Sequence, residues 1–421
     1  MLRKPWYYAA LTVMWAVLIF SACGTGSQEI PEHEVAAGET SDGTENVGNE
    51  NWGTENAGTE DKPGANVAGE VVSSNGEVSE KHPDAEKEDT FFTPTPAVII
   101  PEKIVDTSKE PYIYAELCED VKLLSYAYPD IVSVSWNGKS ADGREIPAIL
   151  FGNPDAERTV FIQAAIHGRE HLTALLVMEQ LETYAKNYET GSYNGVTYKD
   201  IFSEVALLVV PMANPDGVSV SQIGPGAIRS EELRTLVESF YERDGAGADR
   251  TYFYRRYKAN ARGVDLNRNF AYGWEEYGGA KVPAADKYKG ETPGSEPETQ
   301  LLMELTKSRN TAVALSYHAT GSVLYWDFGQ KGALREQCRS FVETVHDLTG
   351  YRIVYASSDK QDEAGYCEWA VGIEGIPEVT IEIGTVAAPL PIGEFAGVWK
   401  RNKEVPVAVA LQVMQDDATT E

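Results

Sequence analysis

The chain has 421 residues and a formal net charge of −29. An acidic balance of this size argues against nucleic-acid binding, which needs a basic footprint. The length allows two or three domains, but the composition separates only an acidic N-terminal stretch from one long globular stretch.

Residues 1–23 are predicted to be an export signal. Arg3 and Lys4 give a positive start, Trp6–Phe20 is an uncharged and mostly apolar core, and small residues precede Cys23. Small residues directly before a cysteine resemble a bacterial lipobox, in which Cys23 would carry lipid and attach the chain to a membrane. A cleaved secretion signal and an uncleaved anchor are the alternatives. The apolar core is short for a spanning helix, which needs about 20 residues.

Residues 24–110 are predicted to form an acidic, low-complexity, disordered linker. Positions 24–100 hold 17 Asp/Glu and 3 Lys/Arg. Low hydrophobicity combined with high net charge does not bury enough apolar surface to offset chain entropy. Two interpretations stay open: a spacer that holds a domain away from a membrane, or a solvated tail without a specific partner.

The four cysteines are Cys23, Cys118, Cys338 and Cys367. If Cys23 carries lipid, an odd number remains and at most one disulfide forms. Their spacing shows no zinc-knuckle pattern. The fold is therefore not a disulfide scaffold, even though the chain is expected to be exported.

Residues 111–415 have the composition of one globular domain, and residues 416–421 are a short tail. Strands are predicted at Val132–Trp136, Ile146–Phe151, Thr159–Ile166, Val205–Val210, Ala312–Tyr317, Val323–Trp326, Arg352–Tyr355 and Val379–Ile383. Helices are predicted at Tyr114–Ala127, Leu172–Tyr188, Glu231–Glu242, Glu298–Ser308, Ala333–Leu348 and Trp399–Gln415. This alternation predicts a three-layer α/β/α domain with a mixed sheet. The strands starting at Thr159, Val205 and Ala312 are continuously apolar, so we expect them at the centre.

Polar residues follow or interrupt three of these strands. His167 and Glu170 follow the first, His318 follows Ala312–Tyr317, and Glu382 lies inside the last strand. Each has a simple structural explanation by itself: a loop histidine, a first-turn helix acid, or an acid paired with a buried arginine. Together, at comparable strand ends, they favour a metal site. Histidine nitrogen and carboxylate oxygen suit tetrahedral zinc.

Five segments in this order resemble the zinc carboxypeptidase family. They are His167-Gly168-Arg169-Glu170, Asn214-Pro215-Asp216-Gly217, the segment Gly263-Val264-Asp265-Leu266-Asn267-Arg268-Asn269-Phe270, Ser316-Tyr317-His318 and Thr380-Ile381-Glu382. Two related classes fit less well. A thermolysin-type peptidase needs His-Glu-x-x-His on a helix. The aspartoacylase-like enzymes share the zinc pattern but lack this close match to the Asn-Arg segment.

The resemblance implies a role for each site residue. His167, Glu170 and His318 would hold one zinc ion and leave a fourth position open, as a catalytic site requires. Glu382 would be the general base. Lys258 would stabilise the oxyanion, with Arg256 as the competing choice.

The resemblance also implies a substrate clamp, because Asn267 and Arg268 would bind a free substrate carboxylate. The position that lines the floor of the specificity pocket falls at Cys367, with Glu368 beside it. The substrate-covering tyrosine of the family falls at Lys360, and Tyr366 is a nearby substitute.

The expected function is that of an extracellular zinc-dependent metallocarboxypeptidase, acting as a monomer on peptides. Bacterial members of the family also cut γ-D-glutamyl-diaminopimelate bonds in cell-wall peptides, and that activity is the alternative. A non-catalytic lipoprotein that binds peptide ends and uses zinc structurally is a third possibility, which would have no need of Glu382.

Overall fold

The computed structural model describes residues 98–355 and 363–418, all within one unit that spans Thr90–Glu421. Residues 1–97 lie outside the described residues, so the expected signal, Cys23 and most of the expected linker are not tested by the structure.

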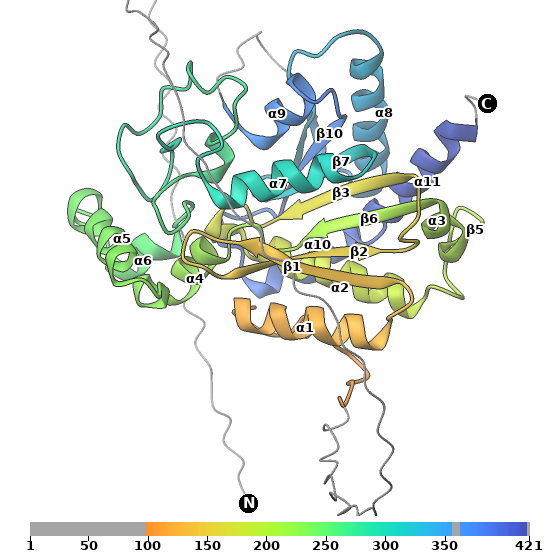
Figure 1. Ribbon diagram of the computed structural model, residues 1–421, viewed down its shortest axis with the longest axis horizontal. Coiled ribbons are helices and arrows are strands. Elements are labelled where there is room, and N and C mark those ends of the chain that lie inside the picture. Colours follow the sequence, from red (N-terminus) through yellow and green to blue (C-terminus); the bar gives the residue numbers. More distant parts are fainter. Residues whose placement is uncertain (1–97, 356–362, 419–421) are drawn as a thin grey trace, which may run out of the picture. The chain divides into compact units, whose positions relative to one another are not determined.

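An eight-stranded mixed sheet runs through the middle of the described part (Figure 1). Its strands are β1 (Val132–Lys139), β2 (Glu145–Phe151), β3 (Arg158–Ala164), β6 (Val205–Val210), β7 (Thr311–Ala319), β8 (Val323–Tyr325), β9 (Arg352–Val354) and β10 (Glu378–Ile383). The spatial order is β1-β2-β6-β3-β7-β10-β8-β9. The four strands β6, β3, β7 and β10 are parallel to one another. The pairs β1–β2, β2–β6 and β8–β10 are antiparallel, and β9 is parallel to β8. Two further strands, β4 (Ser192–Tyr193) and β5 (Val196–Thr197), form a separate hairpin.

Helices cover both faces of the sheet, which confirms the predicted three-layer fold. One face carries α1 (Tyr114–Ala127), α2 (Leu172–Lys186), α3 (Tyr198–Glu204), α8 (Gly332–Thr349), α10 (Phe395–Asn402) and α11 (Val405–Ala418). The other face carries α7 (Pro297–Ser308) and α9 (Tyr366–Gly372). The remaining helices α4 (Pro215–Ile223), α5 (Glu231–Asp244) and α6 (Arg250–Arg255) pack together beside the sheet. Short 3-10 turns are η1 (Gly168–Glu170), η2 (Pro225–Ala227), η3 (Leu266–Arg268) and η4 (Ile392–Glu394).

The central strands are buried on both faces, as their continuous apolar sequence predicts. In β3, Val160 and Ile162 pack in the large core beneath α2 and α11, whereas Phe161 packs on the opposite side against α7 and α9. This follows from the two-residue side-chain period of a strand. Both faces of β3 are buried beneath other elements, and the strand nevertheless carries two buried polar residues, Thr159 and Gln163.

The C-terminal region corrects one prediction, because Trp399–Gln415 is not one helix. The helix α10 ends at Asn402 and α11 begins at Val405. Pro406 explains the break, since proline has no N–H to donate to the carbonyl four residues earlier and its ring clashes there. The carbonyl of Asn402 instead accepts a hydrogen bond of 2.7 Å from the Gln180 side chain.

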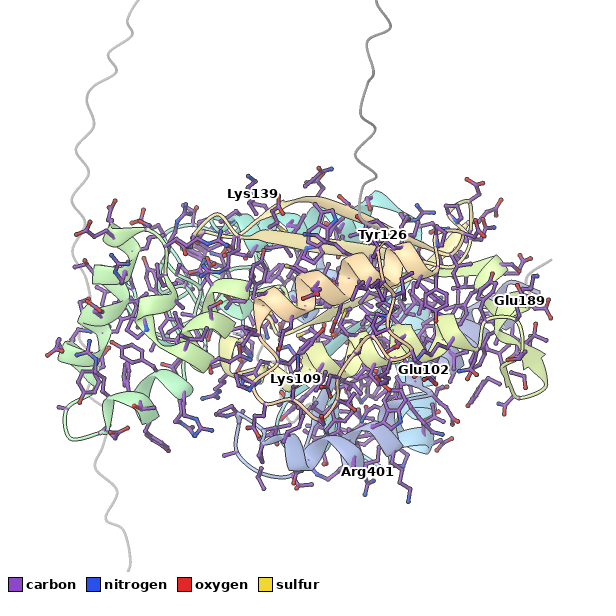
Figure 2. The ribbon with its side chains drawn as sticks, turned by 90° about the horizontal axis from the view of Figure 1, so that it is seen from below. Glu102, Lys109, Tyr126, Lys139, Glu189 and Arg401 are labelled. Carbon is purple, nitrogen blue, oxygen red and sulfur yellow. The ribbon has the colours of Figure 1, made fainter. Side chains whose placement is uncertain are left out.

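Packing begins several residues before residue 111. Ile104 and Val105 are buried, and their backbone N–H groups donate to the two carboxylate oxygens of Glu182 at 2.7 and 2.9 Å. Viewed from below, the segment between the labelled Glu102 and Lys109 runs across the face covered by α1 (Figure 2). Two acids on α2 therefore anchor the start of the folded part: Glu182 through these two hydrogen bonds, and Glu179 through an ion pair with Lys103.

The described cysteines Cys118, Cys338 and Cys367 are all free thiols. Within residues 98–355 and 363–418, none of the helices combines the length and apolar composition that crossing a membrane requires.

Replacing Glu182 by alanine tests this anchor. Two buried N–H groups would lose their acceptors, so we expect the free energy of unfolding to fall by about 2–4 kcal/mol in urea titrations. Glu189 is a suitable control because it is exposed and pairs with Lys199, which is exposed too, and its alanine variant should stay within about 0.5 kcal/mol of wild type. Equal stability of the two variants would contradict the anchoring role.

Candidate metal centre and active site

A tight turn after β3 brings His167 and Glu170 to the edge of the sheet. The strand ends at Ala164, two residues earlier than predicted, and Ala165 adopts a left-handed backbone conformation with φ of 51°. Such a conformation is strained for alanine and is held by its surroundings. The Ala165 N–H donates to the Thr173 hydroxyl at 2.9 Å, and its carbonyl accepts from the Asn214 N–H at 3.2 Å.

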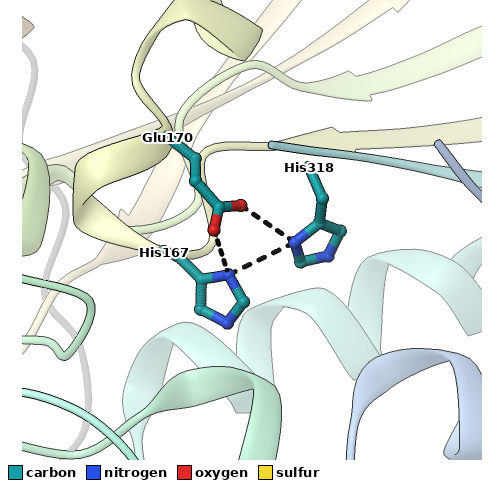
Figure 3. Close-up of side chains that lie close together, drawn as sticks. All are labelled: His167, Glu170 and His318. Atoms are coloured by element: carbon teal, nitrogen blue, oxygen red, sulfur yellow. Dashed lines mark hydrogen bonds and ion pairs between the residues drawn. The ribbon is translucent and has the colours of Figure 1, made fainter. Parts of the chain in front are cut away.

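His167, Glu170 and His318 converge into one buried cluster (Figure 3). His167 Nδ1 lies 2.9 Å from Glu170 Oε1, and His318 Nδ1 lies 3.0 Å from Glu170 Oε2. The two imidazole Nδ1 atoms are 3.2 Å apart. Among the described residues, this is the one group of three such side chains whose ligand atoms all lie within 4.8 Å of one another. The neighbouring His171 is not part of it, and burial lowers the pKa of His171 to about 4.

The donor set fits zinc, because two imidazole nitrogens and one carboxylate oxygen are ligands that zinc accepts and three protein ligands leave one position open. The outward-facing nitrogen of His167, Nε2, lies 3.3 Å from Asp265 Oδ1. Asp265 is fully buried, and a carboxylate behind a ligating histidine orients the ring. Burial by itself would raise the pKa of Asp265, but the neighbouring Lys258 and His167 hold this pKa well below its usual range.

Strand pairing places Glu382 beside the third ligand. In the parallel register of β10 and β7, Glu382 is the direct partner of His318. Direct partners point to the same face of a sheet, so Glu382 and His318 line the same cavity. Burial raises the pKa of Glu382 to about 7, and His318 opposes this rise.

One cavity of about 680 Å³ gathers the site residues that the sequence predicts in the folded part. Its lining includes His167, Glu170, Lys258, Asn267, Arg268, His318, Cys367 and Glu382, and both competing residues, Arg256 and Glu368. Six separate elements and loops contribute these side chains. His167 and Glu382, which are 215 positions apart in the chain, line one cavity because their strands end at the same edge of the sheet.

Asn214 ties the metal-ligand turn to the loop that carries Lys258. Its buried side-chain amide donates to the carbonyls of Ile166, Lys258 and Ala259 at 3.1, 3.2 and 3.1 Å. The Gly168 N–H donates to the Lys258 carbonyl at 3.0 Å. The chains approach closely here, since a Cβ on Gly168 would lie 2.3 Å from the backbone of residue 217. The Lys258 backbone is therefore held against the turn of the first two ligands.

Arg268 and Asn267 lie at another wall of the cavity. The Arg268 guanidinium pairs with Glu363 at 2.5 Å and lies over the Tyr277 ring, 5.2 Å from its centroid. The Asn267 side-chain oxygen accepts from the Tyr366 N–H at 2.9 Å, which connects η3 to α9. Beside them the Cys367 thiol donates to Glu368 Oε2 at 2.8 Å. Burial raises the pKa of both Cys367 and Glu368.

Tyr366 is wrong as a substrate-covering residue. Its ring is fully buried between Phe161, Phe270 and Trp369, and its hydroxyl lies 2.9 Å from the Thr306 hydroxyl. It is a core residue of α9 because the helix turns its side chain toward α7. Lys360, the other position considered, lies outside the described residues.

Sequence reasoning did not assign three residues that the structure brings to the site: Asp265, Arg169 and Glu363. Asp265 lies two residues before Asn267 in the segment Gly263–Phe270, and this position in a recognised motif could have marked it as a site residue. Arg169 stands between two ligands, where only the ligands drew attention. Glu363 carried no signal, because its contact with Arg268 joins positions far apart in the chain.

Asp265→Asn tests the outer contact of His167. Losing the negative charge behind the ring should weaken zinc binding about tenfold to a hundredfold, as measured by competition with a chromogenic chelator. Asp244→Asn, on the exposed end of α5, should leave zinc affinity unchanged. If Asp265→Asn binds zinc as tightly as wild type, Asp265 does not support the metal centre.

The similarity to known proteins covers most of this described unit. A family model described as zinc carboxypeptidase matches residues 117–404. The chain is 30% identical over 293 residues to "Gamma-D-glutamyl-L-diamino acid endopeptidase 1" of Lysinibacillus sphaericus, covering 69% of each chain. It is 27% identical over 284 residues to "Carboxypeptidase B" of Astacus astacus, covering 64% of this chain and 85% of that protein. The crystal structure of thrombin activatable fibrinolysis inhibitor shares the fold, with a TM-score of 0.59 at 16% identity over 74% of this chain and 77% of that one. The chain therefore belongs to the zinc carboxypeptidase family, whose metal suits the ligand group His167, Glu170 and His318.

Proposed function

We propose that the protein is a zinc-dependent metallocarboxypeptidase, which hydrolyses the peptide bond that precedes a residue with a free carboxylate. The observation that carries this proposal is that one cavity holds the ligand group, Glu382 and Arg268 together. These are the three parts that such a reaction needs: a metal, a proton carrier and an anchor for the substrate end.

Zinc, when bound, supplies a Lewis acid that activates water and polarises the scissile carbonyl. Glu382 takes a proton from the attacking water and delivers it to the leaving nitrogen. The C–N bond breaks, a C–O bond forms, and the products are a carboxylate and a free amine. The place of Glu382 beside His318 supports this role.

Lys258 stabilises the negative oxygen that develops on the scissile carbonyl. Its side chain is only 14% exposed and its ammonium lies 3.9 Å from Asp265, the residue that contacts His167. Arg256 is the weaker choice, because its guanidinium packs over the Tyr252 ring at 5.8 Å. The hydrogen bond from the Gly168 N–H to the Lys258 carbonyl holds the Lys258 backbone beside the turn that carries His167 and Glu170.

Arg268, with Asn267, grips the free carboxylate of the leaving residue. Arginine suits this task because its planar fork binds a carboxylate through two parallel hydrogen bonds. Glu363 forms an ion pair with the Arg268 guanidinium, and a substrate carboxylate would take the place of Glu363. Cys367 lines the cavity beside Arg268, where it would contact the side chain of the leaving residue.

A cell-wall peptide hydrolase is the second candidate. The Lysinibacillus sphaericus relative, a gamma-D-glutamyl-L-diamino acid endopeptidase by name, favours it. A diamino acid keeps a carboxylate that Arg268 would bind in the same way, so both candidates use the same clamp and the same chemistry.

Cys23 carries lipid and holds the protein outside the cytoplasm on the membrane, and the acidic stretch after it is the tether. The catalytic domain extends from the packed segment at Ile104 and Val105 to the end of α11 at Ala418, beyond the bounds 111–415 expected from the sequence. The protein acts as a monomer. Mass spectrometry of the N-terminal fragment tests the lipid, and an unmodified Cys23 would remove the anchor from this proposal.

Glu382→Gln tests the proton carrier. The amide cannot accept the water proton, so kcat should fall by about a hundredfold to ten-thousandfold while zinc content stays at one ion per chain. Glu374→Gln, which alters an acid that pairs with Lys307, is the control and should keep full turnover. Unchanged kcat in the Glu382 variant would show that another group carries the proton.

Arg268→Gln tests the clamp with two peptides that differ only in a free or amidated C-terminus. Wild type should prefer the free peptide, and the variant should lose about tenfold to a hundredfold in kcat/KM for it. Arg262 lies in the loop before η3 and its side chain is half exposed, so Arg262→Gln should keep the preference for the free C-terminus. Equal cleavage of both peptides by wild type would exclude recognition of a chain end.

A further inference from the structure

Tyr325, the last residue of β8, lines the cavity but has no part in the reaction proposed above. The residue is 40% exposed, and its hydroxyl forms no hydrogen bond with any residue in the described part of the chain. It shares the cavity with Glu382 and Arg268. A hydroxyl without a partner in the wall of an active site is available to a substrate.

Strand pairing fixes the direction of the Tyr325 side chain. Tyr325 is the direct partner of Thr380 in the antiparallel pair β8–β10 and of Val354 in the parallel pair β8–β9. Direct partners point to the same face of a sheet, and all three residues line the cavity. Glu382 follows Thr380 by two residues, so it lies on this face as well. Tyr325 and Glu382 are therefore diagonal neighbours, a spacing that an aromatic side chain spans.

The order of the strands places Tyr325 on the side of Glu382 that faces away from the metal ligands. The ligands follow β3 or lie on β7, and β10 stands between these strands and β8. Glu363, which pairs with Arg268, lies just before α9, and α9 packs on β10. Lys258, in contrast, is held against the turn after β3. Tyr325 therefore lies beside the strand that supports the clamp segment, whereas β7 and β10 separate it from the turn near Lys258.

The charges around Tyr325 support this position. Burial raises the pKa of Tyr325, and the carboxylates of Glu382 and Glu363 raise it further, whereas Arg352 lowers it. The hydroxyl therefore stays protonated at neutral pH and is a hydrogen-bond donor. One of these two acids is the proposed proton carrier, and the other is paired with Arg268. A substrate carboxylate that takes the place of Glu363 would therefore come close to the same hydroxyl.

We propose that Tyr325 contacts the substrate, donating a hydrogen bond from its hydroxyl to the free carboxylate that Arg268 binds. A carboxylate accepts about four hydrogen bonds, so the two bonds to the arginine fork leave acceptor sites for Tyr325. The bond exists before and during the reaction, so its loss raises KM more than it lowers kcat. The role of Tyr325 rests on the proposed function.

Tyr325→Phe removes the hydroxyl and keeps the ring. The probes are two acetylated peptides that end in lysine, one with an ordinary α-linkage and one with a γ-D-glutamyl linkage, each with a free and an amidated C-terminus. Loss of one hydrogen bond to a charged group should lower kcat/KM for the free peptides by about tenfold to a hundredfold, mainly through KM. The values for the amidated peptides should stay close to those of wild type. Tyr126→Phe, which alters an exposed tyrosine on α1, is the control and should match wild type for every peptide.

A double-mutant cycle with Arg268→Gln tests whether the two side chains hold the same carboxylate. In the Arg268→Gln background, Tyr325→Phe should lower kcat/KM much less than in wild type, because the carboxylate is no longer held beside the hydroxyl. Equal losses in the two backgrounds would overturn the proposal. It would also fall if Tyr325→Phe kept wild-type kcat/KM, or if it slowed the free and amidated peptides equally.

Failure of the Tyr325 contact and failure of the proposed function give different results. If wild type cleaves free and amidated peptides alike, the hydrolase stands, but the clamp and the Tyr325 contact are both wrong. If wild type cleaves none of the peptides, the proposed function fails, and calorimetry with zinc-loaded Glu382→Gln decides on Tyr325. Adding Tyr325→Phe to that variant should weaken the binding of the free peptides alone, and unchanged binding, or no binding in either variant, would overturn the contact.

Discussion

The parallel pairing of β3, β7 and β10 is the constraint on which the site depends. Parallel strands end at the same edge, so the turn after β3 and the last residues of β7 and β10 meet there. Register decides the rest, because Glu382 is the direct partner of His318. A slip by one residue would turn either side chain to the opposite face of the sheet. Helices on both faces bury these strands, and the packed core resists such a slip.

Buried polar contacts then hold the loops in place around that edge. Asn214 satisfies three carbonyls of two different loops, and Asp265 stands behind His167. Arg144 pairs with Asp216 at 2.8 Å at the start of α4, the helix that supports η1. Buried charges are costly unless they are paired, and breaking one such pair leaves the other charge uncompensated. The region around the site is therefore positioned by polar contacts as much as by apolar packing.

The cavity lining carries side chains of both charges, and its acids are Glu170, Asp327, Glu363, Glu368 and Glu382. A chain with a net charge of −29 repels an anionic peptide at long range, yet the cavity holds four cationic side chains. At physiological ionic strength the repulsion is screened beyond about 8 Å, whereas contacts inside a half-enclosed cavity are screened much less. Under the proposed function, recognition of an anionic substrate end would rest on short-range hydrogen bonds to arginine, which would favour selectivity over fast capture.

The sequence by itself determined the layers of the fold, the central strands and the metal ligands. The continuous apolar run Val205–Val210 and the helical spacing of apolar residues in Leu172–Lys186 are both visible in the sequence. The motifs around His167, His318 and Glu382 are also local in the chain. Only the tertiary structure decided what is not local. Glu363 meets Arg268 across 95 positions, Tyr366 turns into the core and away from the cavity, and Pro406 splits a helix whose apolar pattern continues through it. The reason is physical: periodicity specifies which face is buried, but long-range packing decides which side chains share a cavity.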